Sequence, residues 1–135
     1  MKTIINEKPL DYSCSGCSSA AQMANYIAVQ LDREEFAEMS CIAGVGGNVK
    51  KLVRTAQSGR KIIVIDGCPL ACSKACLNNH SIGPDVHIQL TEYGVKKQDH
   101  VYFDKNEANV LFNKIEEVVY SLKTIKQEDI LCAIN

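Results

Sequence analysis

Two stretches of the chain repeat their apolar residues with the 3.6-residue period of an amphipathic helix. In residues 18–33 the apolar side chains share one helical face, made of Ala20, Ala24, Ile27, Ala28 and Leu31. Ser18 or Ser19 can cap the start of this helix. Residues 106–123 show the same period over a longer stretch, with an apolar face of Ala108, Leu111, Phe112, Ile115, Val119 and Leu122. We therefore predict two helices that each bury one side.

Short apolar runs predict the strands. Residues 61–65, KIIVI, form a continuous β-branched run, which is typical of a parallel strand buried on both faces. Residues 9–14, 36–41 and 86–90 predict three further strands, and "EYGVKK" at 92–97 predicts a turn or an edge segment.

Two more helices are expected between these strands. Residues 48–58 place Val49, Leu52, Val53 and Ala56 on an apolar side, and Gly59 is a typical stop. Pro69 suits the first position of another helix, which would end near Asn79. The segment from Thr124 onward has no clear pattern.

Strands that alternate with helices predict an α/β fold, a three-layer βαβ-type sandwich with a mostly parallel sheet of about four strands, of the Rossmann or flavodoxin-like kind. We expect one domain over residues 1–135. Ligands of such sheets bind at the carboxyl ends of the strands. Cys14, Cys41 and Cys68 all follow predicted strands, so we expect their thiols to meet at one edge.

Composition narrows the function classes. The formal net charge is −1 and the basic residues are scattered in sequence, which argues against a nucleic-acid partner. No apolar run reaches the roughly 18 residues that cross a membrane. The first ten residues, MKTIINEKPL, lack the apolar core of a secretory signal. We expect a cytoplasmic protein, in which the seven cysteines stay reduced and serve metal binding or thiol chemistry.

Four of these cysteines have the spacing of a metal site. "CSGC" at 14–17 lets a tight turn direct two sulfurs at one ion, and "CPLAC" at 68–72 places two more at the start of a helix. The first-choice ligand set is Cys14, Cys17, Cys68 and Cys72, with Cys41 as a substitute ligand or a fifth thiol. Zinc is the leading metal. A sulfur-only set suits an iron–sulfur cluster equally well, and a thiol redox or sulfur-transfer enzyme is the other alternative.

The other candidate residues remain open. Cys76 continues the 68–72 spacing and would serve a second metal or fill space as a small hydrophobe, whereas Cys132 is expected to be a free thiol. Asp66 would cap a turn or hydrogen-bond groups around the metal ligands. The glycines of "AGVGG" at 43–47 would pack tightly or hold an anion. His80, His87 and His100 are expected to be structural or solvent-facing.

The same motifs resemble the DGC-domain family, named for Asp66–Gly67–Cys68. The resemblance covers about residues 10–98 and rests on "YSCSGCSS" at 12–19, "MSCIAGVGG" at 39–47, "IVIDGCPLACSKACL" at 63–77 and "HIQLTEYGVKK" at 87–97. It implies zinc binding, with five characteristic cysteines: Cys14, Cys17, Cys41, Cys68 and Cys72. It implies no reaction, so whether the chain is an enzyme, and whether a small molecule binds beside the metal, stay undecided, as does the oligomeric state.

Overall fold

A parallel four-stranded sheet forms the centre of the protein. The computed structural model describes residues 8–134, and the side chains of residues 8–122. The strands lie in the order β2-β1-β3-β4, and every neighbouring pair is parallel. Their bounds are β1 Leu10–Ser13, β2 Glu38–Met39, β3 Ile62–Asp66 and β4 Val86–Gln89.

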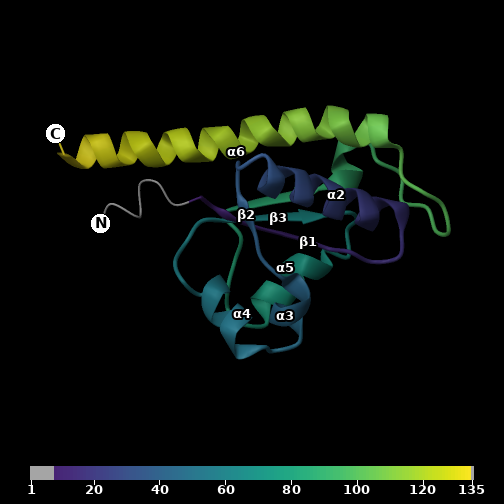
Figure 1. Ribbon diagram of the computed structural model, residues 1–135, viewed down its shortest axis with the longest axis horizontal. Helices are drawn as coiled ribbons and strands as arrows, with labels where there is room; N and C mark the ends of the chain where they lie inside the picture. Colours follow the sequence, from purple (N-terminus) through teal and green to yellow (C-terminus); the bar gives the residue numbers. More distant parts are fainter. Residues whose placement is uncertain (1–7, 135) are drawn as a thin grey trace.

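Helices cover both faces of this sheet, which confirms the predicted α/β fold with its three layers (Figure 1). One face carries α2 and the long α6, and the other carries α3, α4 and α5. The helices are α2 Ser19–Arg33, α3 Ile42–Gly46, α4 Lys50–Ala56, α5 Cys72–Asn78 and α6 Lys105–Ile134, with a 3₁₀ turn, η1 Leu90–Tyr93, after β4.

Strand alternation divides the apolar core between the two faces. In β3, Ile63 and Ile65 pack with the apolar sides of α2 and α6. Ile62 and Val64 point the other way, into a smaller cluster that includes Leu77 of α5. All five residues of β3 are buried, as the uninterrupted apolar run predicts. The predicted apolar faces of α2 and α6 are likewise buried, apart from Leu122, which is half-buried.

The order of the strands creates a switch point between β1 and β3. The chain leaves β1 through α2 to reach β2 at the edge, then returns past β1 through α3 and α4 to reach β3. The connections that leave β1 and β3 therefore lie on opposite faces of the sheet, and they separate at the carboxyl ends of these two strands. This is the place where open parallel sheets bind their ligands.

Several predicted boundaries were wrong. Residues 36–41 form only the two-residue strand β2, and most of "AGVGG" lies in the short helix α3, which the sequence does not predict. The helix predicted over 48–58 is α4, which leaves Val49 half exposed rather than on a buried side. The helix predicted from Pro69 begins at Cys72. In contrast, "EYGVKK" forms a turn, which was one of its two predicted structures, since it begins in η1 and continues through Gly94 at a φ of 89°.

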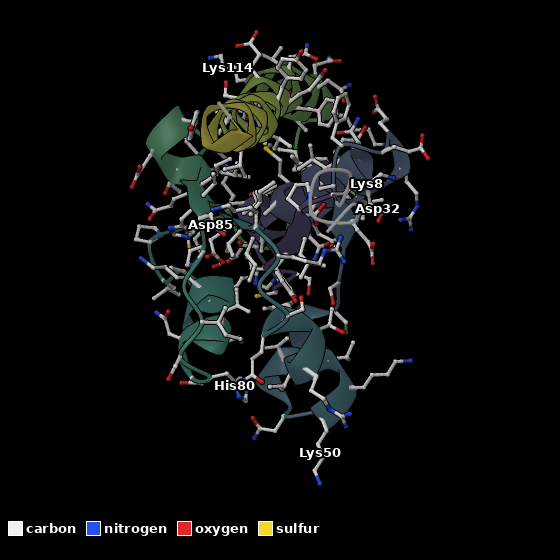
Figure 2. All side chains as sticks on the ribbon, turned by 90° about the vertical axis from the view of Figure 1, so that its left-hand side faces the viewer. Lys8, Asp32, Lys50, His80, Asp85 and Lys114 are labelled. Carbon is white, nitrogen blue, oxygen red and sulfur yellow. The ribbon has the colours of Figure 1, made fainter. Side chains whose placement is uncertain are left out.

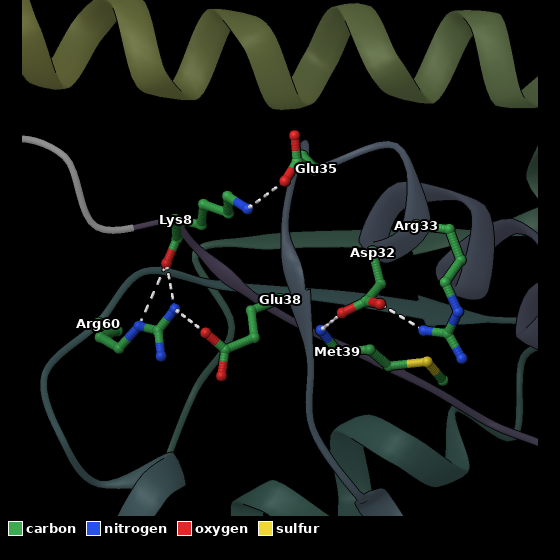
Figure 3. Close-up of polar contacts among 7 residues, drawn as sticks. All are labelled: Lys8, Asp32, Arg33, Glu35, Glu38, Met39 and Arg60. Atoms are coloured by element: carbon green, nitrogen blue, oxygen red, sulfur yellow. Dashed lines mark hydrogen bonds and ion pairs between the residues drawn. The ribbon is translucent and has the colours of Figure 1, made fainter.

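Polar contacts hold the short edge strand β2 in place (Figure 3). The guanidinium of Arg60 donates to the backbone carbonyl of Lys8 and pairs with Glu38. The carboxylate of Asp32 accepts the backbone N–H of Met39 at 2.8 Å. These contacts compensate for the few ladder hydrogen bonds that a two-residue strand can make.

In Figure 2, Lys114 of α6 and Lys50 of α4 lie at opposite ends of the molecule, with the sheet between them. Within the described residues, none of the helices has both the length and the apolar character required to cross a membrane. Cys132 lies in α6, but its side chain is outside the described part, so its prediction as a free thiol stays a prediction.

Candidate functional site: a thiol pocket at the switch point

Two loops from neighbouring strands bring cysteines to the switch point. The loop after β1 carries Cys14 and Cys17, and the turn after β3 carries Cys68 and leads into Cys72 at the start of α5. The sequence predicts this meeting because the carboxyl ends of parallel strands share one edge.

Hydrogen bonds between side chains and backbone hold the loop after β1 in place, and one thiol of this loop remains exposed to solvent. Ser18 is the N-cap of α2, and its hydroxyl accepts the N–H of Ala21 at 3.1 Å. The side-chain amide of Gln22 donates to the carbonyls of Ser15 and Gly16. Cys17, between these anchors, is exposed to solvent.

The two loops touch through Gly67. A Cβ on Gly67 would lie 2.6 Å from the backbone carbon of Ala20, in the first turn of α2. Backbone atoms there cannot yield, so only glycine fits. The N–H of Gly67 donates to the sulfur of Cys14 at 3.2 Å. The close approach thereby fixes one cysteine against the other loop.

The turn into α5 contains a strained residue. Ala71 is the N-cap of α5 and has a φ of 48°, in the left-handed region that alanine rarely adopts. Its N–H donates to the carbonyl of Cys68 at 3.1 Å, which closes the turn. Leu70, which precedes Ala71 in the turn, is 70% exposed. Strain held at one turn is common at functional sites.

The N-cap residue of α5, Ala71, makes no side-chain capping hydrogen bond. Asp66, the last residue of β3, caps the helix instead. Its carboxylate is 1% exposed and accepts the N–H groups of Ser73 at 2.9 Å and Lys74 at 3.3 Å. It also accepts from the Nε2 of His87 at 2.9 Å. Asp66 therefore does cap a helix, as one of its predicted roles required, and it places a buried negative charge beside the cysteines.

The loops enclose a pocket of about 330 Å³. Its walls contain five thiols, namely Cys14, Cys17, Cys68, Cys72 and Cys76. Its charged residues are Asp66 in the wall and Lys97 and Asp99, which are both exposed. Ile42, Leu70 and Ala71 supply apolar surface. The pocket thus gathers sulfur donors in a setting with more acidic than basic groups.

The thiols in this pocket differ in their surroundings. The pKa of Cys14 is raised to about 11, mainly by burial; the hydrogen bond from Gly67 opposes the shift, and the nearby Asp66 carboxylate adds to it. Burial also raises the pKa of Cys76. Both groups are therefore neutral thiols at pH 7. Cys17 and Cys72, in contrast, are exposed.

The structure brings four of the five predicted metal ligands together. Cys14, Cys17, Cys68 and Cys72 all line the pocket, whereas Cys41, the exposed N-cap of α3, does not. Cys76 joins them from the next turn of α5 and packs against the smaller core cluster.

The pocket contains donor atoms of the right kind for a metal ion, but these donors are not arranged closely around one point. Sulfur donors suit zinc or an iron–sulfur cluster. Among the side chains of residues 8–122, however, no three of the types Cys, His, Asp and Glu stand close enough together to hold one ion. The thiols share a pocket but would have to rotate or move inward to bind a metal.

Sequence reasoning placed His87 outside the site. His87 follows the alternation of β4 and faces the same side of the sheet as Val64 and Asp66, because its register partner is Val64. Reading the two strands together, with residues two apart on one face, would have paired it with Asp66. Ser73, Lys97 and Asp99 also line the pocket. Ser73 and Lys97 lie within quoted motifs whose patterns assign them no role, and Asp99 lies outside these motifs. His80 instead donates from Nε2 to the carbonyl of Val45 at 3.0 Å.

Comparisons with known proteins agree with the motifs. The profile of the DGC domain matches residues 11–115. The chain is 51% identical over 111 residues to a protein of Pseudomonas aeruginosa named "Anaerobic and virulence modulator AnvM", and the match covers 82% of this chain and 85% of that protein. No solved structure matches. The chain therefore belongs to the DGC-domain family.

Proposed function

We propose that this chain is a zinc-binding protein whose site is the thiol pocket between β1 and β3. One observation carries the proposal: two segments far apart in sequence, the loop after β1 and the turn after β3 with helix α5, place five cysteine side chains on the walls of one pocket. Inert buried cysteines have no reason to gather in this way, because each could be replaced separately by another small apolar residue.

Cys14, Cys17, Cys68 and Cys72 would hold the ion, because they lie in the two segments that directly follow the neighbouring strands β1 and β3. The acidic groups of the pocket support a cationic ligand, since Asp66 is buried there and a positive ion would balance its charge. When bound, zinc would form a closed structural centre with four thiolates, or a Lewis acid with an open position if only three bind.

A thiol redox or sulfur-transfer enzyme is less well supported. Such enzymes lower the pKa of the attacking thiol with a nearby cation or a helix N-terminus. Here Cys14 is shifted in the opposite direction, and Asp66 contributes to that shift. Burial and a nearby carboxylate favour a neutral thiol that loses its proton only on binding a metal, and disfavour a thiolate that is already ionised for attack on a substrate.

An iron–sulfur cluster is the second candidate. The donor set permits it, and the relative from P. aeruginosa bears the name of an anaerobic modulator. Many clusters are sensitive to oxygen, so an anaerobic role would be consistent with one. By the same extension from the relative's name, we infer a modulating role for this chain.

Elemental analysis of protein purified without oxygen tests the proposal. We expect about one zinc per chain and a colourless preparation. Cys14→Ser, Cys17→Ser, Cys68→Ser and Cys72→Ser should each lose most of the metal. Cys41→Ser is the matched control, because this thiol lies outside the pocket, and it should keep the metal.

Two results would decide against the proposal. A brown preparation with iron and acid-labile sulfide would establish the cluster instead. Full zinc content in all four pocket variants, each shown to be folded by circular dichroism, would exclude these cysteines as the ligands.

A further inference from the structure

The thiol pocket is much larger than a metal ion requires. Its volume of about 330 Å³ compares with roughly 30 Å³ for one water molecule in the liquid. It falls within the range of roughly 300–1,000 Å³ that is typical of small-molecule sites. Apolar groups of Ile42, Leu70 and Ala71 contribute to its lining. An organic molecule has room beside the ion.

A buried hydroxyl in the pocket lacks a partner. Ser73 is 2% exposed and lines the pocket. Its backbone N–H donates to Asp66, which fixes the residue in place. Its side-chain oxygen has no hydrogen-bond partner among the described residues. A buried polar group without a partner is unfavourable. Because the oxygen itself has almost no accessible surface, rotation of the Ser73 side chain toward the pocket would let a polar atom of a ligand satisfy it.

The lining of the pocket includes one positive and one negative side chain, two residues apart in the sequence. Lys97 and Asp99 both line the pocket, on either side of Gln98. Gln98 is anchored to the start of α2: its carbonyl accepts the N–H of Ser19 at 2.8 Å, and its N–H donates to the Ser19 hydroxyl at 3.0 Å. This anchor holds the two charged residues at the rim. Neither forms an ion pair within the part of the chain that the structure describes.

From these three features we propose that the pocket binds a small thiol that carries an amino-acid end group, of the class of free cysteine. The ammonium of the ligand pairs with Asp99 and its carboxylate with Lys97, while a polar atom reaches the Ser73 hydroxyl. The sulfur lies among the thiols and joins the metal. This last contact rests on the zinc site proposed above, whereas recognition of the end groups does not.

Titration of the full-length, zinc-loaded protein with L-cysteine under anaerobic, reducing conditions tests the inference. Binding is followed by amide chemical shifts, and the retained zinc is measured afterwards. We expect L-cysteine to bind at least about tenfold more tightly than L-alanine, which lacks the sulfur. Cysteamine, without the carboxylate, and 3-mercaptopropionate, without the ammonium, should each bind about threefold more weakly than L-cysteine, as exposed ion pairs allow.

Variants identify the contacts. Lys97→Ala should weaken the binding of L-cysteine about threefold and leave the binding of cysteamine unchanged. Asp99→Ala should weaken the binding of L-cysteine about threefold and leave the binding of 3-mercaptopropionate unchanged. Lys96→Ala is the matched control, because this neighbouring lysine does not line the pocket. Ser73→Ala should weaken all three thiols.

The outcomes separate this inference from the proposed function. If the protein retains zinc but does not bind L-cysteine, the inference is overturned and the proposed function is not. The same holds if Lys97→Ala weakens the binding of L-cysteine and of cysteamine equally. Removal of the zinc by L-cysteine also overturns the inference. A protein that holds no zinc overturns the proposed function, and the same titrations on the metal-free chain then decide whether the end groups are recognised.

Discussion

Two buried aspartates on neighbouring strands show how differently the two faces of the sheet treat the same side chain. Asp11 of β1 faces α2 and is fully buried, and neither of its carboxylate oxygens has a hydrogen-bond partner among the described residues. Asp66 of β3 faces α5 and is 1% exposed, yet its carboxylate accepts three hydrogen bonds.

The difference follows from what surrounds each carboxylate. The pKa of Asp11 is raised from 3.8 to about 8, mainly by burial, with a smaller contribution from the nearby Asp32 and an opposing one from Arg33. Asp11 is therefore largely protonated at pH 7 and behaves as a neutral member of the core. Asp66 meets two helix N–H groups and a histidine, which are the groups that stabilise a buried negative charge. Only the second face is built to keep an anion.

Asp66→Asn gives the largest expected effect. The amide replaces one acceptor oxygen with a donor group that faces the N–H groups of Ser73 and Lys74. We expect a loss of about 3 kcal/mol in the free energy of unfolding at pH 7, measured by urea denaturation of the reduced, metal-free protein. Asp99→Asn, an exposed carboxylate on the same pocket, is the control and should change stability by less than about 0.5 kcal/mol. Equal stability of the two variants would contradict this reading of Asp66.

Asp11→Asn should have the opposite sign. Between pH 4 and pH 8 the folded chain holds a proton on Asp11 that the unfolded chain has released, so this group's contribution to stability is present below pH 4 and is lost as the pH rises to about 8. An amide removes that dependence. We expect a gain of about 2 kcal/mol or more at pH 8 and almost none at pH 4. Denaturant midpoints across this range measure it, and a gain that does not vary with pH would refute the protonation argument.

His87→Leu tests the third hydrogen bond to Asp66 and gives the smallest expected effect. It removes one of the three donors to Asp66 while retaining apolar volume, so we expect a loss of about 1 kcal/mol. The same substitution in the Asp66→Asn background should cost clearly less, because the two side chains act on each other. Equal losses in both backgrounds would show that His87 contributes by packing alone.

Much of the fold was predictable because local patterns and long-range packing agree. The period of residues 18–33 matches the face that α2 buries, and the β-branched run of β3 matches a strand covered on both sides. The convergence of Cys14 and Cys68 was predictable for a similar reason, since both follow strands of one parallel sheet.

The errors fall where tertiary contacts replace local signals. Helix α5 begins three residues after Pro69 because the carboxylate of Asp66, on a strand, accepts the first N–H groups. Helix α3 is five residues long and rich in glycine. Such a helix is not stable by its own propensity, and it depends on packing against its neighbours.

The sequence by itself determined the layers, the order of the elements and the edge of the sheet to which the paired cysteines go, because periodicity and strand direction are properties of the chain. The tertiary structure alone decided that Cys76 joins the pocket and Cys41 stays outside, that His87 meets Asp66, and that Lys97 and Asp99 line the rim. These outcomes depend on contacts between segments far apart in sequence, and no local pattern of residues specifies such contacts.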